Sequence, residues 1–184
     1  MTLANQLTVL RMCLVPVLAI LVVYGYFGWA LVVFTIAAVT DTLDGVFARM
    51  RHERTRLGTM LDPIADKLLV MTSLIVLSIR TPLLAVHIPV WVTILAISRD
   101  AGILIAVVVI NLAVERKIFS PSILGKATTT IQLLTIFWIL WSNYRGTELP
   151  LTQILLGAMV GLTLASGLHY IYRARKILAE VEAG

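Results

Sequence analysis

Six long apolar stretches, separated by short polar or glycine-containing breaks, make up almost the whole chain. A transmembrane helix needs about 20 consecutive, mostly apolar residues, and stretches of this length recur along the 184 residues. Hydrophobic residues account for 59% of the sequence and charged residues for 14%, against about 45–50% and 25% in soluble domains. A single soluble core of this size has no room for so many apolar side chains. The sequence therefore predicts an all-α integral membrane protein.

We predict six transmembrane helices in a single membrane domain that covers residues 1–184. Glycines and aromatic residues at 24–29 mark the first break, and Pro82 and Gly146 follow the third and fifth stretches. Residues 179–184 are expected to form a short solvated tail. The predicted spans are 6–26, 28–50, 59–79, 86–112, 123–142 and 149–173.

Basic residues are distributed unequally between the two sides of these spans. The positive-inside rule places the side richer in Lys and Arg in the cytoplasm. With an even number of spans, both termini are then cytoplasmic, and the net charge of +5 suits anionic lipid headgroups and not nucleic acid. One side carries Arg49, Arg51, Arg54, Arg56, Arg116, Lys117, Lys126, Arg173, Arg175 and Lys176, and the other carries Arg80 and Arg145.

Four of the five aspartates lie between positions 41 and 66, around the break between the second and third spans. Asp41 and Asp44 are three residues apart and Asp62 and Asp66 are four apart, so each pair shares one face of a helix. Four converging carboxylates repel one another unless they are protonated or bind cations. Without Cys or His beside them, their oxygens favour Mg²⁺ or Mn²⁺. The simpler alternative is pairing with nearby arginines, or an N-cap at Asp62 before Pro63.

The acidic segment has a defined spacing, which is Asp41-x2-Asp44-Gly45-x2-Ala48-Arg49-x8-Gly58-x3-Asp62-x3-Asp66. At every specified position this pattern resembles the signature of the CDP-alcohol phosphatidyltransferases, whose six-helix membrane fold would cover the chain. The resemblance implies transfer of a phosphatidyl group from a CDP-linked lipid to an alcohol, with release of CMP. It also implies a polar cavity that faces the cytoplasm, a homodimer, and a place in a bacterial inner membrane.

The resemblance also implies roles for the residues of the pattern. Asp66 would act as the general base for the acceptor hydroxyl. The small side chains of Gly45 and Ala48 would let a nucleotide approach the backbone, with tight helix packing as the alternative. The metal ligands would be Asp41, Asp44, Asp62 and Asp66. The nucleotide and its diphosphate would be bound by Gly45, Ala48, Arg49, Thr55 and Gly58.

Two cationic residues outside the pattern are candidates for binding the acceptor. Arg99 precedes Asp100 inside the fourth span, and Lys126 lies at the start of the fifth. Cationic groups of this kind are needed to recognise a phosphate. Similar positions occur in family members whose acceptor is glycerol 3-phosphate, so CDP-diacylglycerol and glycerol 3-phosphate are the expected substrates. The alternatives are a structural Arg99–Asp100 pair and ordinary cytoplasmic charge at Lys126.

Three other functions are weaker alternatives. The segment Ser166-Gly167-x-His169-Tyr170 also resembles family members that use phosphatidylglycerol as the acceptor and form cardiolipin. An intramembrane prenyltransferase also binds a diphosphate with aspartates, but it usually needs more spans. A divalent-cation transporter would distribute its carboxylates along a pathway through the bilayer.

Polar residues near the two ends of the chain are open to more than one interpretation. Asn5 and Arg11 occupy positions similar to those of the opening segment in many bacterial family members. They could contact the substrates, or Asn5 or Thr8 could cap a helix while Arg11 extends to the interface. Tyr170 and its neighbours are expected to form an interfacial aromatic belt.

Overall fold

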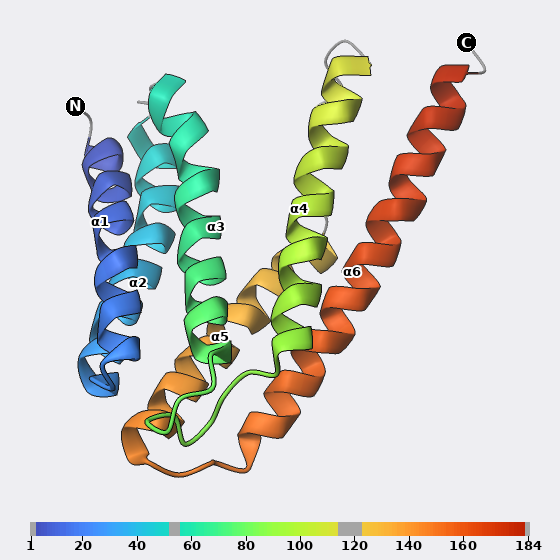
Figure 1. The fold of residues 1–184 in the computed structure, drawn as a ribbon. Helices are drawn as coiled ribbons and strands as arrows, with labels where there is room; N and C mark the ends of the chain where they lie inside the picture. The colour runs from blue at the N-terminus through green and yellow to red at the C-terminus, as the bar shows by residue number, and fades with distance from the viewer. Residues whose placement is uncertain (1–2, 52–55, 114–122, 183–184) are drawn as a thin grey trace.

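The computed structural model describes residues 3–51, 56–113 and 123–182, with side chains for residues 6, 8–40, 67–105, 123–173 and 175. Six helices and no strand are present in these ranges. Successive helices run in opposite directions, so α1 begins and α6 ends at the same end of the bundle (Figure 1). The helices are α1 (Leu3–Val23), α2 (Phe27–Arg51), α3 (Arg56–Ser78), α4 (Val90–Ala113), α5 (Ile123–Arg145) and α6 (Leu151–Glu182). The six predicted helical segments are confirmed as helices.

Glycine ends two of the helices at the places where the sequence predicted breaks. Gly25 and Gly146 have φ angles of 79° and 69°, a left-handed conformation that glycine adopts without steric cost. After α1, the N–H of Gly25 donates to the carbonyl of Val22 at 3.0 Å and the N–H of Tyr26 donates to that of Leu21 at 2.8 Å. This pair of hydrogen bonds is the Schellman cap, and the same pair follows α5.

Two boundaries differ most from the prediction. The fourth helix begins at Val90 and not at 86, because proline disfavours the helical conformation for the residue before it, which here is Ile88. The sixth helix continues to Glu182, so most of the segment predicted as a solvated tail, 179–184, is helical. No glycine or proline interrupts residues 174–182, and Ala, Leu, Glu, Lys and Arg favour the helix.

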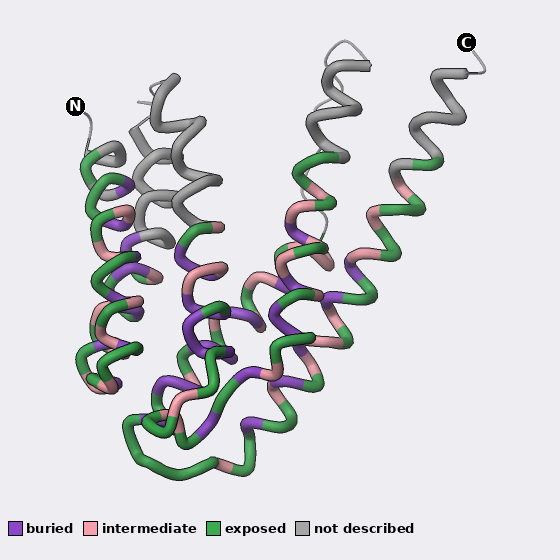
Figure 2. Tube along the Cα trace, in the orientation of Figure 1, coloured by how far each residue is buried: buried purple, intermediate pink, exposed green. Residues whose placement is uncertain are grey.

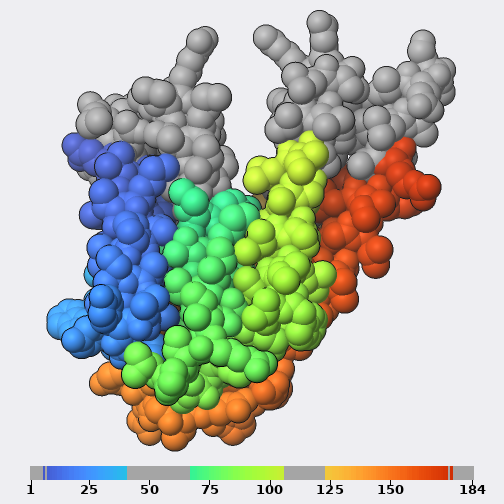
Figure 3. Space-filling view, viewed as in Figure 1, coloured from blue at the N-terminus to red at the C-terminus, as the bar shows by residue number. Residues whose placement is uncertain are grey.

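The helices pack in two groups, α1 to α3 and α4 with α6, which are connected by α5 and by the contact of α4 with α3. The first helix contacts α2 and α3, α4 contacts α3 and α6, and α5 contacts α2, α3 and α6. Figure 3 shows α1, α3 and α4 side by side on one face of the molecule. Buried residues lie along the inner sides of the helices and exposed ones on the outer sides (Figure 2). The fully buried apolar side chains include Leu18, Phe34, Leu74, Leu77, Ile136, Ile139, Leu140 and Met159.

One end of the bundle is closed by two connections, residues 79–89 between α3 and α4 and residues 146–150 between α5 and α6 (Figure 1). We call this the closed end. Buried Asn143 fastens it, because its amide oxygen accepts from the N–H of Val86 at 3.0 Å and its amide nitrogen donates to the carbonyl of Val86 at 2.8 Å. The same nitrogen donates to the carbonyl of Ile139 at 2.9 Å. The α3–α4 connection is thereby tied to α5.

The outer surface of the bundle is strongly apolar. In the described part of the chain, two segments are long and apolar enough to cross a membrane, Ile123–Arg145 and Leu151–Arg173. Three shorter apolar helical segments accompany them, Thr8–Val23, Phe27–Thr40 and Lys67–Ser78. Of the apolar 18-residue stretch within each of the two longer segments, only 33% and 22% is buried. Such extensive exposed apolar surface is unusual for a soluble monomer and is typical of helices in contact with lipid.

Candidate active site

The aspartate pattern lies on the second and third helices. The bounds of α2 include Asp41 and Asp44, and those of α3 include Asp62 and Asp66, so the helical spacing assumed for each pair holds for the backbone. The third helix begins at Arg56, six residues before Asp62, and the interpretation of Asp62 as an N-cap is therefore wrong. The side chains of the four aspartates, Gly45, Ala48, Arg49 and Gly58, and the whole of Thr55, lie outside the described residues.

A charged network starts one residue after this pattern. Lys67 of α3 donates to one carboxylate oxygen of Asp100 on α4 at 2.6 Å, and Arg99 donates to the other at 2.6 Å. The side chain of Asp100 is 3% exposed and that of Arg99 6%. Both carboxylate oxygens of Asp100 are paired with cations, as a buried charge requires. The network joins α3 to α4, and the sequence-based pairing of Arg99 with Asp100 is confirmed.

Arg99 extends the network to the sixth helix. Its second terminal nitrogen donates to the hydroxyl of Ser166, and its guanidinium carbon lies 5.9 Å from the centre of the Tyr170 ring, within the range of a cation–π contact. Its Nε atom is buried and has no hydrogen-bond partner among the described residues. The guanidinium is therefore held by three groups, and one of its three nitrogen atoms has no partner among the described residues.

A polar cavity of about 220 Å³ lies beside this network, lined by residues of α3, α4, α5 and α6. Among the described residues that line it, three are cationic, Lys67, Arg99 and Lys126, and one is a carboxylate, Asp100. Lys126 is exposed, and Lys67 is 28% exposed. The excess of positive charge in a partly closed site suits a small anionic ligand. The structure thus brings together the two acceptor-binding candidates, Arg99 and Lys126, around one cavity.

Sequence reasoning missed two residues of this cavity. Lys67 was overlooked, although it directly follows Asp66 in the chain. Tyr170 was assigned to an interfacial belt, but it is half-buried, lies under Arg99 and lines the cavity. Tyr170 lies four residues after Ser166, which places both on one face of α6. This spacing was the sequence signal that could have placed Tyr170 beside Ser166.

The N-terminal candidates are only partly described. The side chain of Asn5 lies outside the described residues. Arg11 is 1% exposed and makes a polar contact, so the expectation that it extends to the interface is wrong. Thr8 is fully buried inside α1 and does not cap the helix.

The family model for CDP-alcohol phosphatidyltransferases matches residues 1–165. The chain belongs to this family. It is therefore an enzyme, a transferase that acts on CDP-linked substrates, as the aspartate pattern predicted.

Curated relatives of similar length support the assignment. A probable phosphatidylglycerophosphate synthase of Mycobacterium tuberculosis (strain CDC 1551 / Oshkosh) is 35% identical over 182 residues, which cover 94% of this chain and 81% of the relative. The CDP-diacylglycerol--glycerol-3-phosphate 3-phosphatidyltransferase of Salmonella choleraesuis (strain SC-B67) is 34% identical, with 92% of each chain covered. The protein of the same name from Escherichia coli (strain K12) is 33% identical, with 95% of each chain covered.

Proposed function

We propose that the protein transfers a phosphatidyl group from CDP-diacylglycerol to glycerol 3-phosphate, giving phosphatidylglycerophosphate and CMP. Three relatives at 33–35% identity carry names that state this product or this reaction. In the reaction, the acceptor hydroxyl oxygen forms a bond to the phosphorus of the phosphatidyl group. The bond from that phosphorus to the oxygen of CMP breaks, and the hydroxyl proton passes to a base.

The polar cavity is the observation that carries the choice of acceptor. Glycerol 3-phosphate brings a phosphate dianion that CDP-diacylglycerol does not share. In our proposal Arg99 and Lys126 bind this phosphate, Arg99 through the guanidinium N–H groups that Asp100 and Ser166 leave free and Lys126 through its ammonium group. Asp100 and Lys67 act as positioning groups. Asp100 accepts hydrogen bonds from both Lys67 and Arg99 and thereby fixes the guanidinium of Arg99.

The aspartate pattern supplies the reacting end of the proposed site. Carboxylate oxygens are the donors that Mg²⁺ and Mn²⁺ prefer, and the donor set of Asp41, Asp44, Asp62 and Asp66 fits such an ion. A bound divalent cation would neutralise charge on the diphosphate and on the leaving CMP. Asp66 accepts the proton of the acceptor hydroxyl. It directly precedes Lys67 in α3, which lines the acceptor cavity.

The same proposal covers the protein's place in the cell. Six membrane-spanning helices with both termini in the cytoplasm agree with the common end of α1 and α6 and with the bacterial relatives. In this orientation the aspartate pattern faces the cytosol, from which glycerol 3-phosphate arrives. We place the protein as a homodimer in the bacterial inner membrane.

Release of CMP by the purified protein tests the proposal. The assay supplies CDP-diacylglycerol and Mg²⁺ and compares glycerol 3-phosphate with phosphatidylglycerol as the acceptor. CMP release that depends on glycerol 3-phosphate supports it. Release with phosphatidylglycerol alone would make the protein a cardiolipin synthase. No release with either acceptor would contradict the proposal and favour the alternative functions, a prenyltransferase or a cation transporter.

A further inference from the structure

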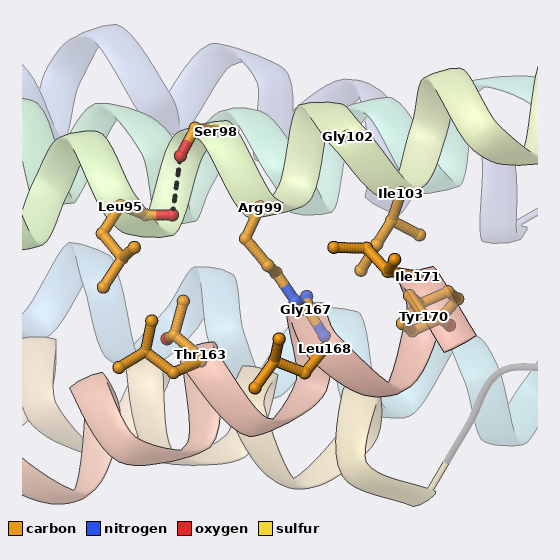
Figure 4. A pocket seen from close by; sticks show the side chains of 11 residues that line it. Leu95, Ser98, Arg99, Gly102, Ile103, Thr163, Gly167, Leu168, Tyr170 and Ile171 are labelled. Atoms are coloured by element: carbon orange, nitrogen blue, oxygen red, sulfur yellow. Dashed lines mark hydrogen bonds between the residues drawn. The ribbon is translucent and has the colours of Figure 1, made fainter. Parts of the chain in front are cut away.

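A second cavity, larger than the first, lies between α4 and α6 (Figure 4). Its volume is about 380 Å³, within the usual range of ligand-binding pockets. We call it the α4–α6 groove. Leu164, Leu168 and Ile171 line it and are 49%, 68% and 60% exposed, so the groove is open at the outer surface of the helices. That surface is the part of the bundle that faces lipid in the proposed membrane orientation.

The serine and threonine hydroxyls of the groove are already used within their own helices. Ser98 donates to the carbonyl of Leu95 at 3.0 Å, as Figure 4 shows, and Thr163 donates to the carbonyl of Met159 at 2.6 Å. The remaining lining is largely leucine, isoleucine and glycine. A polar ligand would find few partners here, and the groove suits a hydrocarbon chain.

The groove and the polar cavity share one wall. Arg99, Ile103 and Tyr170 line both, and Figure 4 shows Arg99 extending from α4 towards α6. A ligand that occupies both spaces therefore has an anionic part beside Arg99 and an apolar part in the groove. This is the composition of a phospholipid.

We propose that the α4–α6 groove holds an acyl chain of the CDP-diacylglycerol donor. The proposal rests on the function proposed above and extends it. The acceptor oxygen and the phosphatidyl phosphorus must approach to about 3–3.5 Å before they react, so the phosphatidyl group comes to the edge of the acceptor cavity. Its chains must leave that cavity through an apolar opening, and the groove begins at the shared wall.

Gly102 gives a way to fill the groove without disturbing the fold. A Cβ atom built on Gly102 meets nothing within 4 Å, so Gly102→Leu places its side chain in the open groove. Gly157 on α6 also has nothing within 4 Å and does not line the groove. Gly157→Leu is therefore the matched control, with the same gain in helix propensity. Gly102→Ala is a smaller step at the same position.

The test uses CDP-diacylglycerol with a photoreactive diazirine at the end of one acyl chain, added to the protein in phosphatidylcholine nanodiscs. Irradiation followed by mass spectrometry is expected to find label on α4 and α6, at groove residues such as Leu95, Leu164 and Leu168. Gly102→Leu should lower this labelling by about tenfold or more, since one methylene in a closed apolar site already changes binding by 10–200-fold. It should raise the KM for the donor and leave the KM for glycerol 3-phosphate unchanged. Gly157→Leu should match the unmodified protein, and Gly102→Ala should fall between the two.

Competition separates the donor from other occupants. Unlabelled CDP-diacylglycerol should displace the label, whereas added phosphatidylglycerol should not. Label elsewhere in the chain, equal loss in the Gly157→Leu control, or better displacement by phosphatidylglycerol would each overturn the proposal. Cross-linking of the groove to a second copy of the chain would overturn it as well. If the unmodified protein releases no CMP with glycerol 3-phosphate, the proposed function fails separately, whatever the labelling shows.

Discussion

The closed end and the polar cavity both bury polar groups, but they satisfy them differently. At the closed end, Asn143 is 4% exposed and its amide bonds to backbone groups of Val86 and Ile139. At the polar cavity, Asp100 pairs with two cations, and Arg99 keeps a buried nitrogen without a partner among the described residues. The Asn143 amide is fully paired without a ligand, although the nearby hydroxyls of Ser142 and Thr152 are buried without a partner among the described residues. At the polar cavity, the described cations outnumber the described carboxylate and one nitrogen of Arg99 is unpaired. These groups are available to bind an anionic ligand.

The comparison makes opposite predictions for substitutions in the two regions. Changes at the closed end should lower stability and leave the activity of each folded molecule intact. Changes at the polar cavity and the adjoining aspartates should lower activity and leave the fold intact. The expected effects below run from the largest to the smallest.

Replacing the proposed base should have the largest effect. Asp66→Asn is expected to lower turnover about 10²–10⁴-fold, the contribution typical of a general base, because the amide does not accept the hydroxyl proton. Binding of CDP-diacylglycerol should remain within a fewfold of that of the unmodified protein. Rates of CMP release and donor binding would be measured on the same preparation. Near-normal turnover would show that Asp66 is not the base.

Replacing the amide at the closed end should destabilise the protein. Asn143→Ala leaves the buried N–H and carbonyl of Val86 unpaired, at a cost of about 1–3 kcal/mol for each group. A lower thermal midpoint is expected, with unchanged CMP release for each folded molecule at low temperature. Gln153→Ala is the control, since Gln153 is exposed at the same end and bonds to exposed Glu148. A selective loss of turnover in Asn143→Ala would contradict the structural role.

A change in the geometry of the acceptor site should have an intermediate effect. Arg99→Lys keeps the charge but loses the planar fork that reaches both Asp100 and Ser166. The KM for glycerol 3-phosphate should rise about tenfold, which corresponds to about 1.4 kcal/mol. Steady-state kinetics with each substrate varied in turn would measure this. Arg145→Lys, at an exposed position near the closed end, should change neither KM.

The smallest effect is expected at Lys126. This side chain is exposed, so water and salt screen its charge. Lys126→Gln should raise the KM for glycerol 3-phosphate by about twofold to fivefold at low salt, as expected for a screened pair worth less than about 1 kcal/mol. The difference should shrink in 0.5 M salt. A large increase in this KM that does not depend on salt would contradict the expectation, because it would show that Lys126 binds the phosphate at a site shielded from solvent.

Much of the fold could be predicted because local signals encode it. Glycines at 25 and 146 mark helix ends through their backbone conformation, and the lengths of the apolar stretches give the helices. The start of α4 and the length of α6 were predicted less accurately. Helix preference, and not hydropathy, decides where α6 ends, and that helix runs past the apolar region.

The candidate site was predictable only in part. The aspartate pattern is local and carries its own spacing, but Lys67 and Asp100 are 33 residues apart in the sequence, and only the packing of α3 against α4 brings them together. Tyr170 was misassigned because an aromatic residue near the end of an apolar stretch has the same sequence pattern whether it faces lipid or a guanidinium. The α4–α6 groove has no sequence signal, since its lining resembles any apolar helix face.

The central claim is that the charged cavity recognises the phosphate of the acceptor. The most direct test compares glycerol 3-phosphate with glycerol in CMP release by the purified protein, supplied with CDP-diacylglycerol and Mg²⁺. The two molecules offer the same kind of hydroxyl and differ in the phosphate. CMP release with glycerol 3-phosphate and almost none with glycerol is the predicted result. Equal release with both would contradict the claim, because it would show that Arg99 and Lys126 contribute nothing to the choice of acceptor.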